Sequence, residues 1–253
     1  MPHIDELIAD LDTLLEPAAF RDYGPNGLQV PGAERVSRVA TGVSANRELI
    51  ERAVEAQAQM LLVHHGLFWE FMPPGLTPTL AGRLRPLFRH DLNLAAYHLP
   101  LDGHEVVGNN ALLAQALGCV RHEPFAETRG RRIGRIGHFD PEPIAADDLF
   151  ASVHEVTGRE PLVFDAGPPR VRRIGIVSGS AAKALPEAVA LGLDAFLTGE
   201  PAEHVMADAR EARIHFIAAG HYATETFGVK ALGERLAQQF GIEHVFIDVP
   251  NPI

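Results

Sequence analysis

The stretch Met60-Leu61-Leu62-Val63-His64-His65-Gly66 passes from an apolar run directly into two histidines and a glycine. A short apolar run of this kind is typical of a strand that is buried on both faces, as in a parallel sheet covered by helices. Two later apolar runs end in similar residues, namely His98-Leu99-Pro100-Leu101-Asp102 and His221-Tyr222-Ala223-Thr224-Glu225. Because ligands of open α/β proteins bind at the carboxyl ends of strands, the three clusters indicate a functional site there.

The first of these stretches belongs to a pattern that occurs twice along the chain. Each copy reads as strand, helix, strand, helix and strand, with the strand stretches at 38–44, 60–66 and 92–97 in the first copy and at 173–180, 195–200 and 214–219 in the second. We interpret the pattern as an internal duplication. We therefore predict an α/β fold of two similar three-layer α/β/α halves, with largely parallel sheets and a metal site in the cleft between strand ends.

Segments in the middle of the chain indicate the boundary between the two halves. A basic, glycine-bearing segment at 129–135 is followed by Asp140-Pro141-Glu142-Pro143, which marks a loop before a helix at 145–156. We place the boundary near residue 125. Residues 1–125 then carry His64, His65 and Asp102, and residues 126–253 carry His221 and Glu225. Packing of the C-terminal elements against the first half stays open.

The composition of the chain limits which partners and which cellular setting we expect for the protein. The chain has 253 residues with 22 basic and 33 acidic side chains, a net charge of −11, which argues against nucleic acid as a partner. The charge is compatible with the small-molecule substrate that we expect, including a phosphorylated one held by metal. Cys119 is the single cysteine, so we expect a reducing, cytoplasmic setting. Residues 1–16 have the pattern of an amphipathic acidic helix and lack the features of a signal peptide. No apolar segment is long enough for a membrane span, so we expect no membrane partner.

His64 and His65 are adjacent, so in a regular strand their side chains would point to opposite faces. Gly66 favours a turn instead, in which both rings converge on one site. The alternative interpretation is two surface histidines at the end of a strand.

Pro100 argues against a helix through His98 to Asp102 and favours a loop in which both side chains face one cleft. Asp102 is the stronger ligand candidate of the two, since a carboxylate can bridge two cations. The alternative is a capping aspartate before the turn at Gly103.

His221 and Glu225 are four residues apart and would share one face of a helix that starts near Tyr222. On local grounds this is the strongest of the three clusters. The alternative is an ordinary hydrogen-bonded pair in a first helical turn. Thr198-Gly199-Glu200-Pro201 takes the place of the histidine pair in the second copy, and we interpret it as the capped start of a helix.

Three imidazoles and two carboxylates, with His98 in reserve, exceed what a single tetrahedral ion needs. Two divalent ions per subunit, Zn, Fe, Mn or similar, would use them all and would make hydroxide available at neutral pH, so hydrolysis is the natural chemistry. His98 could act as a nearby acid or base. The chain has no P-loop, dinucleotide-binding glycine motif or serine-hydrolase motif.

Taken together, these residues resemble the Nif-three-like dinuclear metal-centre family, also called GTP cyclohydrolase 1 type 2 homologues. The match is carried by Asn26-Gly27-Leu28, His64-His65-Gly66, Tyr97-His98 with Asp102, Thr198-Gly199-Glu200, and Gly220-His221 with Glu225. The resemblance implies that the metal ligands are His64, His65, Asp102, His221 and Glu225. It also implies a homohexameric ring of three dimers with the metal sites facing an inner cavity.

The sequence leaves three alternative functions open. The first is a dinuclear metal-dependent hydrolase, of which cyclohydrolase-type ring opening of a purine nucleotide such as GTP is one version. The second is a non-catalytic metal-binding scaffold. The third is a regulatory protein that acts through partners.

Overall fold

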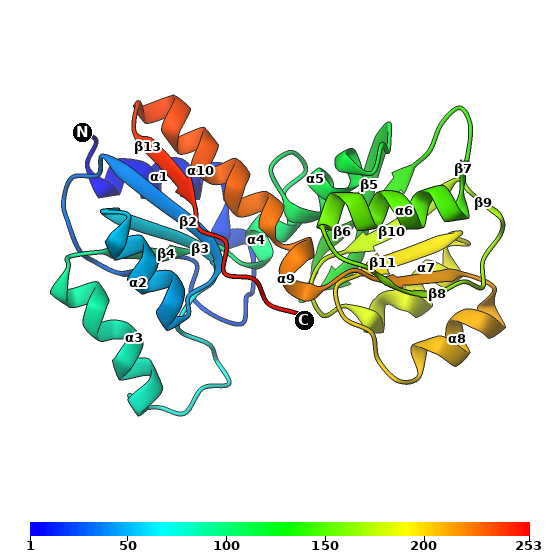
Figure 1. The fold of residues 1–253 in the computed structure, drawn as a ribbon, viewed down its shortest axis with the longest axis horizontal. Helices are drawn as coiled ribbons and strands as arrows, with labels where there is room; N and C mark the ends of the chain where they lie inside the picture. The colour runs from blue at the N-terminus through cyan, green and yellow to red at the C-terminus, as the bar shows by residue number, and fades with distance from the viewer. The chain divides into compact units, whose positions relative to one another are not determined.

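Residues 1–253 of the computed structural model form two units (Figure 1). Unit 1 comprises Met1–Leu101 and Gly228–Val249, and unit 2 comprises Asp102–Phe227 and Pro250–Ile253. The first boundary therefore lies at residue 101, earlier than the position near 125 that the composition suggested. The reason is α5 (Asn109–Ala116), whose Leu113 joins the apolar core of unit 2.

Unit 1 is built on a five-stranded sheet. Its strands, in spatial order, are β1 (Gly27–Val30), β4 (Asn93–Ala96), β3 (Met60–His65), β2 (Arg38–Ser44) and β13 (Glu243–Phe246). β4, β3, β2 and β13 pair in parallel, and β1 is antiparallel to β4. The parallel pairing predicted for the first three apolar runs is confirmed.

Helices cover both faces of this sheet. On one face lie α2 (Arg47–Glu55) and α3 (Pro78–Arg89), whose leucines pack against Leu61 and Leu94. On the other face lie α1 (Ile4–Leu15), followed by a short 3₁₀ turn at Pro17–Ala19, and α10 (Thr226–Phe240). The predicted N-terminal amphipathic helix is thus present, and Arg235 of α10 pairs with Asp10 of α1 at 2.9 Å.

Unit 2 contains a six-stranded sheet. Its strands, in spatial order, are β5 (Arg121–Thr128), β6 (Arg131–His138), β10 (Arg173–Val177), β11 (Ala195–Thr198), β12 (His215–Ala218) and β8 (Leu162–Phe164). The central three strands are parallel, as the second copy of the pattern predicts. The outer strands are antiparallel, so this sheet is mixed. The β5–β6 hairpin turns at Arg129-Gly130, where both residues have positive φ, which is the requirement of a type I′ turn.

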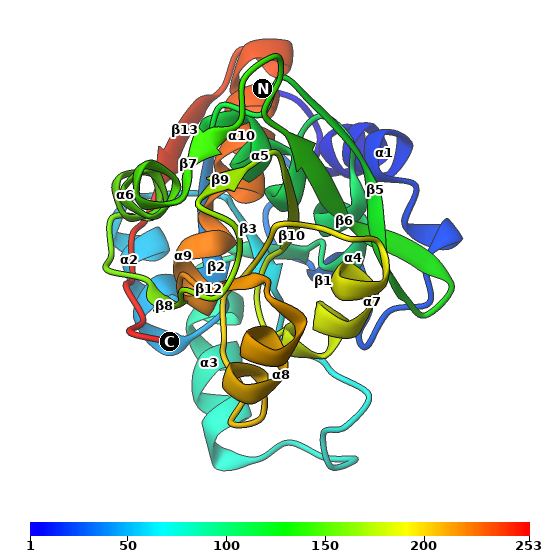
Figure 2. The same cartoon turned by 90° about the vertical axis from the view of Figure 1, so that its right-hand side faces the viewer.

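Helices also cover both faces of the second sheet (Figure 2). α5 and α6 (Ala146–Thr157) pack on one face, and α7 (Leu185–Ala190) and α8 (Val205–Ala212) pack on the other. α6 is the helix predicted at 145–156. The remaining elements are short: α4 (Leu99–Gly103), α9 (His221–Thr224), a 3₁₀ turn at Ala182–Ala184, and the paired strands β7 (Ile144–Ala145) and β9 (Arg170–Val171).

Two predictions about where helices begin are wrong. Thr198-Gly199-Glu200-Pro201 does not open a helix, because α8 begins only at Val205. The segment that contains Pro100 does form a short helix, α4, because proline is tolerated in a first helical turn, where no backbone N–H bond is lost.

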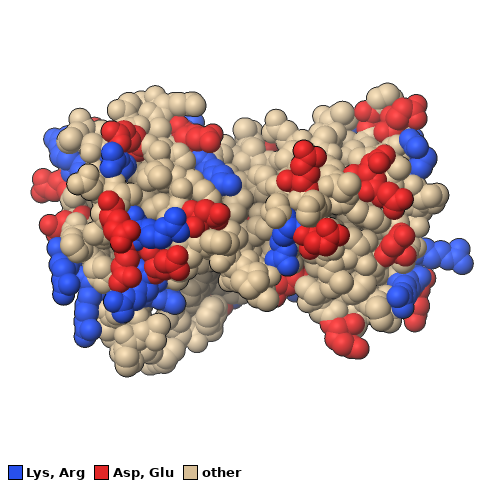
Figure 3. Space-filling view, in the orientation of Figure 1, with Lys and Arg blue, Asp and Glu red and all other residues tan.

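No helix of the chain has the length and apolar character needed to cross a membrane. Lys, Arg, Asp and Glu side chains of both signs are interspersed on the face drawn in Figure 3.

Candidate metal centre

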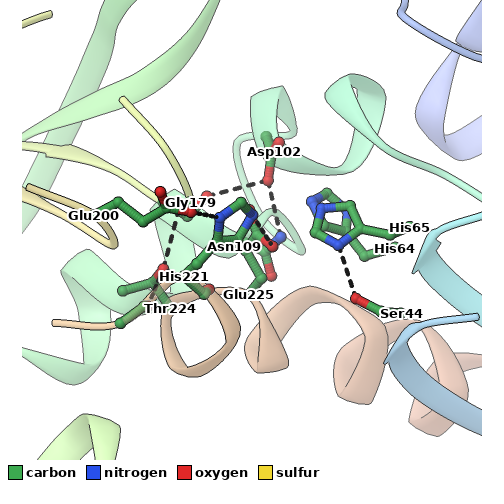
Figure 4. A network of polar contacts seen from close by, with 12 residues as sticks. Ser44, His64, His65, Asp102, Asn109, Gly179, Glu200, His221, Thr224 and Glu225 are labelled. Carbon is green, nitrogen blue, oxygen red and sulfur yellow. Dashed lines mark hydrogen bonds and ion pairs between the residues drawn. The ribbon is translucent and has the colours of Figure 1, made fainter. Parts of the chain in front are cut away.

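In unit 1 two histidines end strand β3. The His64 side chain is fully buried, and its Nδ1 donates a hydrogen bond to the Tyr97 carbonyl oxygen at 3.0 Å. Nδ1 of His65 is hydrogen-bonded to Ser44 Oγ at 3.0 Å (Figure 4). The two ring centroids are 4.6 Å apart, although adjacent side chains in a regular strand diverge. The rings therefore lie together at the carboxyl end of the sheet.

His98 follows β4 and is held by the loop that contains Asp22 and Asn26. Its Nδ1 donates to Asp22 Oδ1 at 2.7 Å, and its backbone N–H donates to Asn26 Oδ1 at 2.8 Å. The Asp22 side chain is only 3% exposed and also accepts from Asn26 Nδ2 and from the Leu99 N–H. Burial would raise the pKa of Asp22, but its hydrogen bond to His98 and the charge of that ring bring the pKa below its ordinary value.

These three histidines form a set of nitrogen donors. Their ligating atoms lie within 4.8 Å of one another. Because the acceptors for His64 and His98 are a carbonyl and a carboxylate, Nδ1 carries the proton in both rings, and the lone pair of the neutral ring is on Nε2. Imidazoles that ligate metals are oriented in this way by a partner on the second nitrogen. The set therefore fits a divalent metal ion such as Zn or Fe.

In unit 2 the pair predicted four residues apart is present. His221 begins α9, and its Nε2 lies 3.2 Å from Glu225 Oε2. The helix is interrupted at Glu225, whose φ of −113° and ψ of 9° lie outside the helical range, and α10 starts only at Thr226. The carboxylate of Glu225 is 3% exposed. The two side chains are therefore in direct contact, with the carboxylate buried and the imidazole 28% exposed.

Glu200 is a second carboxylate partner of His221, and the sequence did not predict this role. Its carboxylate is hydrogen-bonded to Nδ1 of His221 (Figure 4). Burial would lower the pKa of His221, but the hydrogen bonds and charges of Glu225 and Glu200 raise it to about 9. Without a metal, a protonated imidazole thus lies between two carboxylates. A metal ion on Nε2 would take the place of that proton and give the carboxylate, histidine and metal arrangement known from many metal sites.

Asp102 lies in α4 at the start of unit 2 and is 4% exposed. Its Oδ1 accepts hydrogen bonds from Asn109 Nδ2 at 2.9 Å and from Ser178 Oγ at 3.2 Å. Ligating oxygens of Asp102 and Glu225 lie within 4.8 Å of each other. The buried, neutral hydrogen-bond donors keep this carboxylate in one orientation, as a metal ligand requires.

Gly179, in the loop after β10, leaves room for these side chains. A Cβ at this position would lie 2.3 Å from Glu225 Oε1 and 3.1 Å from His221 Nε2. Its φ of +66° also disfavours other residues. Neither this glycine nor Asp22 was identified from the sequence, because nothing local links them to the ligand residues.

The fold and its side chains define an α/β protein with His, Asp and Glu clusters near strand ends that could hold metal ions. The family model for Duf34/NIF3 (NGG1p interacting factor 3) matches residues 2–252. The chain is 46% identical over 249 residues to the protein of Pseudomonas aeruginosa named GTP cyclohydrolase 1 type 2 homolog, with 98% of each sequence covered. The chain belongs to the Duf34/NIF3 family.

Solved structures agree with this assignment. The chain superposes on protein ybgI, described as of unknown function, with a TM-score of 0.93 and 38% identity over 100% of both chains. It superposes on the protein TTHA1606 of Thermus thermophilus with a TM-score of 0.90, 38% identity and the same coverage. Both the family resemblance and the α/β fold class expected from the sequence are confirmed.

Proposed function

We propose that the chain is a dinuclear metal-dependent hydrolase, with His64, His65, Asp102, His221 and Glu225 as ligands of two divalent ions. The observation that carries the proposal is that four of the five candidate ligands are each anchored by a second group. Each imidazole has a hydrogen-bond partner on Nδ1, and Asp102 has two neutral donors on one oxygen. Such outer contacts are typical of metal sites.

Two such ions, held by these five residues, would supply a Lewis acid and would make hydroxide available at neutral pH. Hydrolysis also needs a group that moves a proton. We assign this task to His98, because Asp22 on its Nδ1 fixes the tautomer and would stabilise the charged ring. His98 is thus the catalytic acid or base of the proposal, and Asp22 is its positioning residue.

The relatives' name supports one substrate class. The similar protein of Pseudomonas aeruginosa is named GTP cyclohydrolase 1 type 2 homolog, so ring opening of a purine nucleotide such as GTP is the version of hydrolysis to test first. That reaction needs attack by water on a ring carbon and a group that moves a proton, for which His98 is placed.

The test begins with metal content per chain, measured by elemental mass spectrometry on protein purified without chelator or nickel column. We expect about two transition-metal ions per chain, as for other dinuclear sites. The loaded protein is then assayed against GTP and a panel of amide, phosphoester and cyclic substrates. Protein that stays empty after incubation with Zn, Mn and Fe(II) contradicts the proposal. Two ions without any turnover would instead make the protein a non-catalytic metal-binding scaffold.

The variant His98→Gln separates the two roles open to that ring. As a catalytic acid or base, it should leave metal content unchanged while turnover falls by about 100-fold or more. Loss of one ion would make His98 a ligand. His90→Gln is the matched control, because His90 is an exposed histidine of the same unit.

We also propose, on the family resemblance, that the chain forms a homohexamer in the cytoplasm. Light scattering should then give six times the chain mass of 27.4 kDa. A monomer or dimer at micromolar concentration would contradict this assembly.

A further inference from the structure

Unit 2 contains a cavity that the metal ligands do not fill. Its volume is about 320 Å³, at the lower end of the range for small-molecule sites. The polar lining consists of Arg159, Glu160 and Glu200 together with backbone groups of Gly199 and Gly220. The apolar lining is formed by Pro161, Leu162, Pro201, Ala218, Pro252 and Ile253. The cavity therefore adjoins Glu200, the carboxylate bonded to His221.

The guanidinium of Arg159 is the cation of this cavity and has no acidic partner. Its Nη1 donates to the Pro252 carbonyl oxygen at 2.6 Å, which is its one hydrogen bond. The buried Nε has no hydrogen-bond partner. A Cβ at Gly220 would lie 2.5 Å from Nη1, so the guanidinium packs directly against the backbone beside His221.

The acidic residues of the lining are engaged elsewhere. Glu200 is bonded to His221, and Glu160 is 86% exposed and pairs with His154 at 3.1 Å. A partly buried guanidinium without a counterion loses hydration that the protein does not replace. An oxyanion would supply the missing charge, and the planar arrangement of arginine N–H groups suits carboxylate and phosphate oxygens.

We infer that this cavity binds a small molecule through a carboxylate or phosphate group that pairs with Arg159. The apolar wall formed by Leu162 and the prolines would contact the body of that molecule. Binding itself does not depend on the metal ions. Only the role of the ligand rests on the proposed function: the cavity would hold the anionic end of the substrate, next to Glu200 and His221.

The test uses the full-length, metal-free protein and three probes: inorganic phosphate, phenyl phosphate and benzoate. Each is titrated while the ¹⁵N–¹H signals of arginine Nε groups and of Gly199 and Gly220 are followed. We expect saturable shifts of the Arg159 signal and tighter binding of the two aromatic probes than of phosphate. The more strongly bound of phenyl phosphate and benzoate identifies the anionic group. In Arg159→Gln the affinity should fall by about tenfold or more, because a charge-assisted hydrogen bond is lost.

Two further variants make the outcome decisive. Arg170→Gln is the matched control, since Arg170 also donates to a single carbonyl, that of Pro143, and is exposed; its affinity for the probes should not change. Arg159→Lys keeps the charge, should retain part of the affinity, and replaces the glutamine variant if that variant does not fold. Three results would overturn the inference. The first is equal binding by Arg159→Gln and the unaltered protein, and the second is that no probe shifts any signal. The third is a shift without saturation, which indicates an adventitious ion only. Metal content is measured in parallel, so a chain that binds anions but no metal refutes the proposed function alone.

Discussion

The clusters of the two units differ in charge. In unit 1 the donors are three imidazoles, which are held by a carbonyl, a hydroxyl and the Asp22 carboxylate. In unit 2 two buried carboxylates, Asp102 and Glu225, accompany a single imidazole, which is itself bonded to Glu200. Unit 1 thus offers mainly neutral donors, and unit 2 offers mainly negative charge.

On the proposed function, this difference predicts that the two clusters affect metal binding in different ways. Without metal, unit 2 balances its own negative charge by a proton on His221, whose pKa is raised to about 9. Unit 1 fixes ring orientation through hydrogen bonds and adds little charge. Carboxylates of unit 2 should therefore set the strength of cation binding, and histidines of unit 1 should set which metal fits.

The largest effect is expected when a carboxylate and an imidazole ligand are removed separately. Glu225→Gln should weaken metal binding more than His64→Gln does, because it removes a ligand and also a buried negative charge. We expect a loss of more than about 100-fold for Glu225→Gln, beyond the range typical of outer-contact variants. Competition with a chromophoric chelator measures both affinities. The exposed Glu211 provides the control variant Glu211→Gln, and equal affinities for Glu225→Gln and this control would remove the carboxylate from the site.

A smaller effect should separate the outer contacts of two proposed ligands, His221 and His65. Glu200→Gln removes a charged partner of His221, and Ser44→Ala removes a neutral partner of His65. We expect the first to weaken metal binding by about 10-fold to 100-fold and the second by less, since a carboxylate raises ligand basicity more than a hydroxyl. The same chelator competition tests this order. A larger loss for Ser44→Ala would contradict the inference that the carboxylates of unit 2 set the strength of cation binding.

The loop after β10 allows a steric test within unit 2. Gly179→Ala should destabilise the protein by about 2 to 4 kcal/mol, because the new methyl group meets Glu225 and the residue keeps a positive φ. Gly192→Ala has a similar φ of +63° with no atom within 4 Å, so it should cost only about 1 to 2 kcal/mol. Urea unfolding of both metal-free variants gives the difference. If both variants lose the same free energy of unfolding, the contact of the new methyl group with Glu225 does not destabilise the protein.

The clusters of candidate ligands could be picked out in the sequence because each one follows an apolar run, and runs of that kind mark strands whose carboxyl ends meet. The same pattern predicted the three parallel strands at the centre of each sheet. Asp22 and Glu200 could not be found, since they are 76 and 21 residues from the histidines they bond. Their positions follow from tertiary packing of loops, which no local period encodes.

Other features were obscured by competing local signals. Pro100 indicated a loop, whereas a proline in the first turn is compatible with α4. The β5–β6 hairpin has Arg129-Gly130 at its turn in place of the usual asparagine and glycine, and its exposed strand residues gave no continuous apolar run. The edges of the second sheet were therefore not predicted, although its centre was.

The smallest expected effect concerns a histidine of unit 1 that behaves in the opposite way to His221. His244 of β13 is hydrogen-bonded to Thr41 Oγ1 at 2.8 Å, and burial brings its pKa below the ordinary value of 6.5, with Glu234 opposing the shift. The folded chain then binds fewer protons here than the unfolded chain, so this contribution to stability is present above pH 6.5 and is lost as the pH falls toward the lowered pKa. His244→Gln should therefore make the free energy of unfolding less dependent on pH between about 7.5 and 5.5, a range that brackets an ordinary imidazole pKa. Urea unfolding at both pH values, with the exposed His90→Gln as control, measures the change, and an unaltered pH dependence would show that His244 titrates alike in the folded and unfolded chain.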